Sequence, residues 1–167
     1  RPPPVVVDRP RRRQAPDAEA REERIRLRRF DRDGRAAVVA VVPAAERRTT
    51  LERLRAICLA LPETSERLSH GAPTFFVREK HAFLMVLTDH HGDGRFAIWC
   101  AAGEGVQSML VEAEPEKFFV PPYVGHRGWL GVRLDVGLDW NELAGIAEDA
   151  YAEVAPAKLV EAARSSA

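Results

Sequence analysis

The chain has few cysteines and no long hydrophobic run. Its 167 residues include two cysteines, which cannot form a disulfide framework or a four-cysteine zinc site. The longest apolar runs, 36–42 and 96–102, have seven residues each, whereas a membrane-spanning helix needs about 20. We therefore expect no membrane partner and a reducing, cytoplasmic location, because free thiols are usual there.

The sequence also lacks the motifs of common enzyme classes. It contains no phosphate-binding loop, dinucleotide-binding glycine pattern, nucleophile elbow or HExxH zinc motif. Cys100 ends a predicted strand, so we expect it to be buried rather than reactive. We assign no catalytic residue and no cofactor. If catalysis occurs, His70 or His126 is the acid–base candidate, because histidine titrates near neutral pH.

Charge is unevenly distributed along the chain. Residues 1–48 contain 14 arginines and 8 acidic residues, a net charge of +6, and residues 49–167 carry −6. The first segment has six prolines and one aromatic residue, too little apolar surface for a packed core. We predict that 1–48 is a mostly disordered tail, with a charged helix over 19–29 and a strand over 35–42.

The tail has two interpretations. As a basic arm, it would add affinity for phosphates. Alternatively it has no role, because it begins with Arg rather than Met and its Arg, Ala and Pro content is typical of translated GC-rich upstream DNA. We favour the second interpretation and expect deletion of 1–47 to leave folding and ligand binding intact.

Residues 49–167 contain alternating helix and strand signals. Thr49 and Glu52 form a capping box before an apolar helical stripe that Pro62 ends. Asp139 and Glu142 form a similar box before the last long stripe. The predicted helices are 49–61, 103–114 and 139–155, followed by a short last turn over 157–164, and the predicted strands are 74–77, 81–88, 95–100, 118–120 and 129–134.

The predicted order of elements is α-β-β-β-α-β-β-α. Short turns between strands indicate a five-stranded antiparallel sheet, and about three helices cover it in a two-layer α+β domain. Within 81–88, Phe83, Met85 and Leu87 share one side with His81, and Leu84 and Val86 share the other with Ala82 and Thr88. Since both sides are apolar, we expect both to be covered, or one to line a pocket.

Three motifs, taken in order, resemble the MmcQ/YjbR family. They are His70-Gly71-Ala72-Pro73-Thr74-Phe75, Asp89-His90-His91-Gly92-Asp93-Gly94-Arg95, and the run from Phe118 to Trp129. The resemblance covers 51–159 and leaves the tail out. It implies a small α+β fold similar to secretion chaperones and frataxin-like domains. It also implies a DNA-binding role in which hairpins act as paired wings, an inference from fold analogy.

The second motif, residues 89–95, has two interpretations, a metal site or a tight turn. Asp89, His90, His91 and Asp93 carry side chains that suit a transition metal. However, adjacent histidines in a loop point in different directions, so we favour a tight turn and assign no metal ligand. In such a turn the two aspartates accept from backbone N–H groups and the glycines adopt positive φ.

Two sets of binding residues follow. The first could line a ligand cleft, or simply pack under a loop: His70, Tyr123, His126, Arg127 and Trp129. The second could contact nucleic-acid phosphates from the hairpin turns: Arg78, Lys80, His90, His91, Arg95, Arg127 and Arg133. The −6 charge opposes generic DNA binding, because phosphate neutralisation provides most of its affinity.

We therefore predict a binding module, with DNA as the first candidate partner and a small ligand or a protein as the second. A positive stripe joining Arg78, Lys80, Arg95 and Arg127 would favour nucleic acid. A pocket bounded by His70, Tyr123 and Trp129 would favour a small ligand. A protein partner, as for a secretion chaperone, would require an exposed apolar patch.

Overall fold

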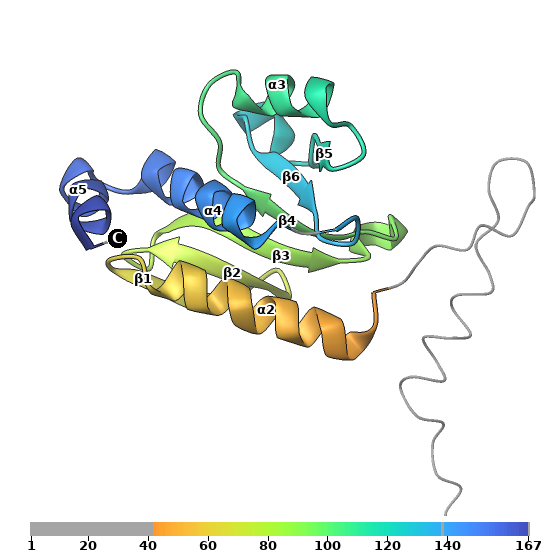
Figure 1. Ribbon diagram of the computed structural model, residues 1–167, viewed down its shortest axis with the longest axis horizontal. Coiled ribbons are helices and arrows are strands. Elements are labelled where there is room, and N and C mark those ends of the chain that lie inside the picture. Colours follow the sequence, from red (N-terminus) through yellow and green to blue (C-terminus); the bar gives the residue numbers. More distant parts are fainter. Residues whose placement is uncertain (1–41, 138, 167) are drawn as a thin grey trace, which may run out of the picture. The chain divides into compact units, whose positions relative to one another are not determined.

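The computed structural model describes residues 42–137 and 139–166. These residues form four α-helices and six strands (Figure 1). The helices are α2 (Ala44–Leu59), α3 (Val106–Ala113), α4 (Trp140–Val154) and α5 (Ala157–Ser166). The strands are β1 (Thr64–Ser69), β2 (Ala72–Val77), β3 (His81–Thr88), β4 (Phe96–Cys100), β5 (Phe118–Phe119) and β6 (Leu130–Arg133). Two short 3-10 turns, η1 (His90–Gly92) and η2 (Gly125–Arg127), lie in the connections.

The strands form one antiparallel sheet in the order β1-β2-β3-β4-β6-β5. The α+β class and the antiparallel pairing are confirmed, but the prediction of five strands and three helices missed β1 and gave α5 only as a short last turn. β1 has the sequence Thr-Ser-Glu-Arg-Leu-Ser, which gives almost no apolar signal. Its ladder to β2, from Thr64 opposite Val77 to Ser69 opposite Ala72, holds it in place.

One face of the sheet is covered by α2 and α4 (Figure 1). We call it the helix-covered face. Leu54 and Cys58 of α2, and Leu143, Ala147 and Tyr151 of α4, are buried against the strands there. The Tyr151 hydroxyl donates to the carbonyl of Pro62 at 2.9 Å, and Arg55 of α2 binds Glu66 of β1 at 2.7 Å. Apolar burial and satisfied polar groups therefore hold this layer together.

The start of α2 differs from the prediction. The helix begins at Ala44, so residues 44–48, which we had assigned to the tail, are helical. The predicted capping box is wrong, because Thr49 lies inside the helix and its hydroxyl donates to the carbonyl of Ala45 at 3.1 Å. The helix over 19–29 and the strand over 35–42 lie outside the described residues, apart from Val42, which precedes α2 as irregular structure.

The cap of α4 is confirmed in its main feature. The Asp139 carboxylate accepts from the backbone N–H groups of Asn141 and Glu142, at 2.8 and 3.4 Å. The Glu142 side chain forms an ion pair with Lys117, which ties the start of α4 to the residue before β5.

β3 does not alternate strictly. Phe75 of β2 pairs with Leu84 whereas Phe76 pairs with Ala82, so Phe83 is an extra residue in a β-bulge. As a result, Phe83 joins Leu84 in the main core, where it lies 5.8 Å from the Tyr151 ring centroid. The prediction that Phe83 shares a side with Met85 and Leu87 is therefore wrong.

The opposite face carries a smaller apolar cluster. Leu87, Ala97, Trp99 and Phe119 are buried in it, and Ala72, Met85, Val124 and Trp129 pack at its margin. None of these residues lies in a helix; Val124 and Trp129 belong to the connection 120–129, which covers part of the cluster. We call this surface the loop-covered face. Both faces are covered, as predicted, but by different means.

Candidate functional site

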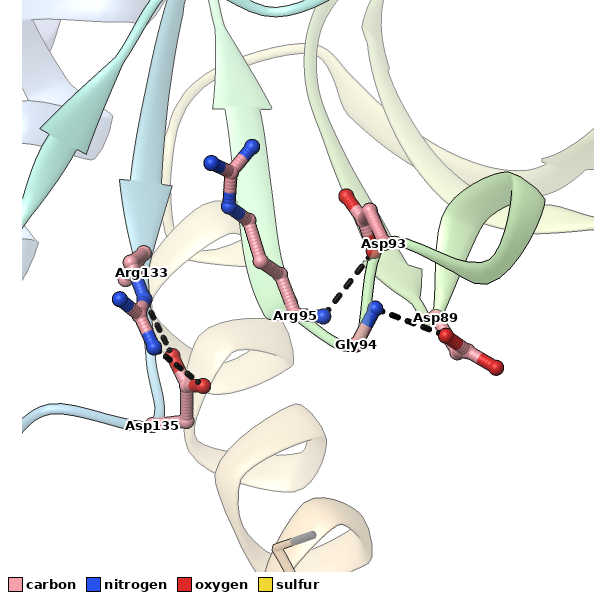
Figure 2. A network of polar contacts seen from close by, with 6 residues as sticks. All are labelled: Asp89, Asp93, Gly94, Arg95, Arg133 and Asp135. Atoms are coloured by element: carbon pink, nitrogen blue, oxygen red, sulfur yellow. Dashed lines mark hydrogen bonds and ion pairs between the residues drawn. The ribbon is translucent and has the colours of Figure 1, made fainter. Parts of the chain in front are cut away.

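The connection 89–95 between β3 and β4 is a tight turn, as predicted. The Asp89 carboxylate accepts from the N–H of Gly94 at 2.8 Å, and the Asp93 carboxylate accepts from the N–H of Arg95 at 3.0 Å (Figure 2). Gly92 and Gly94 adopt positive φ. Across the described residues, no group of three or more His, Cys, Asp or Glu side chains is arranged to hold a metal ion.

The histidines of this turn lie against aromatic rings of the loop-covered face. The His90 ring centroid is 4.8 Å from that of Trp99, 4.3 Å from that of His91 and 6.1 Å from that of Tyr123. His91 lies 6.0 Å from Tyr123. All four contacts are edge-to-face, the geometry that ring quadrupoles favour. We call these four residues the histidine–aromatic cluster.

Tyr123 reaches the cluster from the connection 120–129, which is pinned at several points. The Gln107 amide of α3 donates to the carbonyls of Gly125 and Trp129. Gly125 packs so closely that a Cβ there would lie 2.5 Å from Cγ1 of Val120. The backbone of this connection is therefore held in place, whereas Tyr123 itself is 69% exposed.

The cluster combines strained backbone with an unpartnered polar atom. Asp89, His91 and Tyr123 adopt positive φ, between 49° and 65°, as do four residues in other turns, Glu63, His70, Arg78 and Glu79. This conformation costs about 1–2 kcal/mol for residues other than Gly, Asn and Asp. The His90 Nε2 atom is buried and has no hydrogen-bond partner within the described chain. Strain and unpaired buried polar atoms concentrate at functional sites, so this cluster is the strongest candidate site.

Arg95 extends the site along the same face. Its guanidinium carbon lies 4.3 Å from the ring centroid of Phe119, which packs in the cluster that holds Trp99. Phe119 in turn lies over Gly131 of β6, where a Cβ would be 2.5 Å from two ring carbons. Because Gly131 has no side chain, the Phe119 ring can lie against β6, and Arg95 stacks on this ring.

The residues predicted to contact nucleic acid are divided between the two ends of the sheet. Arg78 and Lys80 lie in the β2–β3 turn, whereas residues 89–95 follow the other end of β3, an eight-residue strand that spans roughly 25 Å. Arg78 binds Glu63 at 2.5 Å. Arg133 binds Asp135 through two hydrogen bonds, at 3.0 and 2.9 Å (Figure 2), and this bonding raises the pKa of Arg133.

The residues of the predicted cleft are only partly brought together. Tyr123 belongs to the cluster, Trp129 packs at the margin of the loop-covered face, and His126 and Arg127 are exposed in η2. His70 lies in the β1–β2 turn at the end of the sheet where β3 finishes, with its Nδ1 3.2 Å from the Ser69 hydroxyl. Tyr123 instead meets His90 and His91, which the sequence placed in a separate set.

Sequence reasoning missed Trp99, Phe119 and Gln107 as parts of the site. Strand alternation could have identified Trp99, because it places Arg95, Ala97 and Trp99 on the same side of β4. Nothing in the sequence pairs Gln107 with the connection 120–129. Cys100 and Cys58, by contrast, are buried as predicted, and burial raises the pKa of each thiol to about 12.

Comparison with known proteins finds a matching family and a crystal structure with a similar fold. A family model described as YjbR matches residues 59–153. The crystal structure of the Deinococcus radiodurans protein DR2400, a DUF419 domain, superposes with a TM-score of 0.55 at 17% sequence identity, covering 70% of this chain and 86% of that chain. At this identity the likeness extends to the fold alone. No curated protein matches the chain. None of the described helices has the length and apolar character needed to cross a membrane.

Proposed function

The chain belongs to the YjbR family, and we propose that its folded domain is a binding module that takes a small ligand at the histidine–aromatic cluster. One observation carries this proposal. Two connections far apart in the sequence converge over Trp99 and hold His90, His91 and Tyr123 edge to face, on backbone that is strained at three positions. Packing alone does not require such strain, since glycine or asparagine would relieve it.

Charge also favours a small ligand over a long polyanion. Residues 49–167 carry a formal charge of −6, which repels a nucleic-acid backbone as a whole. The two connections that form the cluster carry two acidic residues, Asp89 and Asp93, and two arginines, Arg95 and Arg127, so a compact ligand meets no large net charge there. Aromatic edges and a few polar atoms are the usual lining of small-molecule sites.

Native mass spectrometry of the full chain, purified from its own cell, tests the proposal. We expect a retained small molecule that, when added back to the stripped protein, shifts amide resonances in 89–95 and 120–129. His91→Ala should weaken its binding about tenfold. His81→Ala is the matched control, because His81 is also exposed but lies at the far end of β3. A retained ligand that shifts other regions only would contradict the proposal.

DNA is the second candidate partner. The observation that favours it is the exposure of Lys80 and Arg127 on connections between strands, where side chains can reach a phosphate backbone. A gel shift across salt concentrations tests it. Binding that weakens steeply as salt rises, and weakens further in Arg127→Gln, would support it. A complete lack of a shift at low salt would exclude it.

A protein is the third candidate partner. Val120 and Tyr123, on one connection, are 54% and 69% exposed, so they provide an apolar rim that a protein side chain can cover. In the same mass-spectrometry experiment, a retained polypeptide lost on Val120→Ser would favour this chaperone-like role over a small ligand.

A further inference from the structure

The starting point is the buried Nε2 atom of His90. An imidazole nitrogen is always a hydrogen-bond donor or acceptor, and its burial without a partner is unfavourable. His90 Nε2 has no partner in the described residues, although the ring contacts those of Trp99, His91 and Tyr123 edge to face. These neighbouring rings contact His90 without giving Nε2 a hydrogen bond, so the arrangement fits a closed subsite better than a finished core.

Of the three rings that contact His90, two belong to exposed residues that have room to move. Trp99 is 4% exposed and packs among Leu87, Ala97 and Phe119, so it is fixed. Tyr123 and His91 are exposed, and Tyr123 contacts the cluster by ring edges at about 6 Å between centroids. Gln107 holds the backbone of the same connection at Gly125 and Trp129, so a rotation of the Tyr123 side chain would not require the loop to move.

The chemistry of the opened space selects the ligand class. Its walls are ring edges and faces, which favour a flat aromatic partner. Its buried polar atom without a partner is Nε2 of His90, which requires a hydrogen-bonding atom in that partner. The two connections carry Asp89, Asp93, Arg95 and Arg127, so their acidic and basic residues balance in number. The balance selects neither an anion nor a cation.

We propose that rotation of Tyr123 exposes Nε2 of His90, and that this atom hydrogen-bonds a neutral, planar heteroaromatic ring seated beside His91 where the tyrosine ring now lies. This inference rests on the proposed function and names the ligand class of that site. Trp99 is the fixed floor of the subsite, His90 its recognition atom and Tyr123 its cover.

Benzimidazole is a suitable probe, because it is flat, neutral at pH 7.5 and has both a donor and an acceptor nitrogen. Titrated into the full chain, it should shift the His90 Nε2 resonance in a nitrogen-15 side-chain spectrum. His90→Phe keeps a ring against Trp99 but removes the nitrogens, and should weaken binding at least tenfold. Tyr123→Ala removes the cover and should bind benzimidazole as tightly as the wild type or several times more tightly.

Controls separate this inference from the proposed function. His81→Phe makes the same chemical change at an exposed histidine and should leave benzimidazole binding unchanged. Equal affinity of wild type and His90→Phe, or a Tyr123→Ala variant that no longer binds, would overturn the inference. If benzimidazole leaves His90 undisturbed while the retained ligand still shifts 89–95, the inference fails and the proposed function stands. A carboxylated benzimidazole that binds over tenfold more tightly would contradict the neutral class.

Discussion

The two faces of the sheet are built on different principles. The helix-covered face buries aliphatic and aromatic side chains from α2, α4 and the strands, and its polar atoms, such as the Tyr151 hydroxyl and Glu66, have partners. The loop-covered face has a smaller apolar cluster, strained residues at Asp89, His91 and Tyr123, and an unsatisfied imidazole nitrogen. Most apolar burial lies on the first face, and the buried polar atom without a partner lies on the second.

The contrast explains how a small domain can hold a strained site. A sheet anchored on one side by two helices tolerates local strain on the other, because the strained connections start and end in fixed strands. β3 and β4 supply the ends of 89–95, and β5 and β6 supply the ends of 120–129. α2 and α4 therefore support the cluster through the strands, and α3 holds the connection 120–129 through Gln107.

The largest expected effect compares two neighbours on β3. Phe83→Ala removes a fully buried ring from the helix-covered face and should lower the free energy of unfolding by about 3–5 kcal/mol. Met85→Ala, on the loop-covered face and only half-buried, should lower it by less than about 2 kcal/mol. Urea unfolding followed by circular dichroism measures both, and equal losses would break the comparison between the faces.

The second prediction tests the Phe119 ring on which Arg95 stacks. Gly131→Ala places a Cβ against the Phe119 ring, and this overpacking should cost about 1–3 kcal/mol in the free energy of unfolding. Gly145→Ala is the matched control, because no atom lies within 4 Å of its added Cβ and the site is helical, so stability should stay constant or rise by up to about 1 kcal/mol.

An unchanged Gly131→Ala variant would mean that Phe119 moves without cost. The loop-covered face would then be looser than its burial indicates. Loss of the Phe119 ring contacts in a proton spectrum, together with the expected destabilisation, would instead confirm that glycine is needed there for close approach.

The helix-covered face is largely predictable from sequence, and the reason is physical. Periodic apolar residues identify α4 and β3, and Asp139 marks a helix start through bonds made by neighbours in the chain. Leu130 and Val132, alternate residues of β6, both lie in this core, as the period of two in a strand requires. Errors arose where nonlocal contacts decide the outcome: β1 is held by its ladder to β2, and the bulge at Phe83 turns an apparent outward residue inward.

The candidate site was predictable in its parts but not in its assembly. The turn chemistry of Asp89, Asp93 and the two glycines, Gly92 and Gly94, depends on residues within 89–95, so the sequence predicts it. The meeting of His90 with Tyr123 depends on how the connection 120–129 folds back over the sheet, which Gln107 fixes from a third element. No local pattern encodes that contact.

A third prediction uses the two buried thiols of the helix-covered face. Burial raises the pKa of both Cys58 and Cys100 from 9.0 to about 12. Their neutral forms are therefore favoured in the folded state, so their contribution to stability is complete below pH 9 and is lost as the pH rises toward 12. At pH 10 the loss should be about 1.4 kcal/mol per thiol relative to pH 7.

Urea unfolding at pH 7 and pH 10 measures this loss. Cys58→Ala should reduce the pH-dependent part of the loss by about 1.4 kcal/mol, whatever its effect on the stability at pH 7. Neither thiol should react with a disulfide reagent in the native protein, because each is fully buried. Rapid reaction at pH 8 would show that the helix-covered face opens readily and would remove its contrast with the other face.

The smallest expected change in stability is that of Tyr123→Asn, which tests whether a residue of the loop-covered face serves binding or the fold. Asparagine adopts positive φ more easily than tyrosine, so Tyr123→Asn relieves backbone strain while it removes only edge contacts of a ring that is 69% exposed. The free energy of unfolding should therefore stay constant or rise by up to about 1 kcal/mol. Glu79→Asn, at φ 58° in the β2–β3 turn, is the control for strain relief away from the site. Because Tyr123 covers the proposed subsite, Tyr123→Asn should bind the retained ligand as tightly as the wild type or several times more tightly, whereas Glu79→Asn should leave its affinity unchanged. A clear loss of stability in Tyr123→Asn would mean that the ring serves the fold instead.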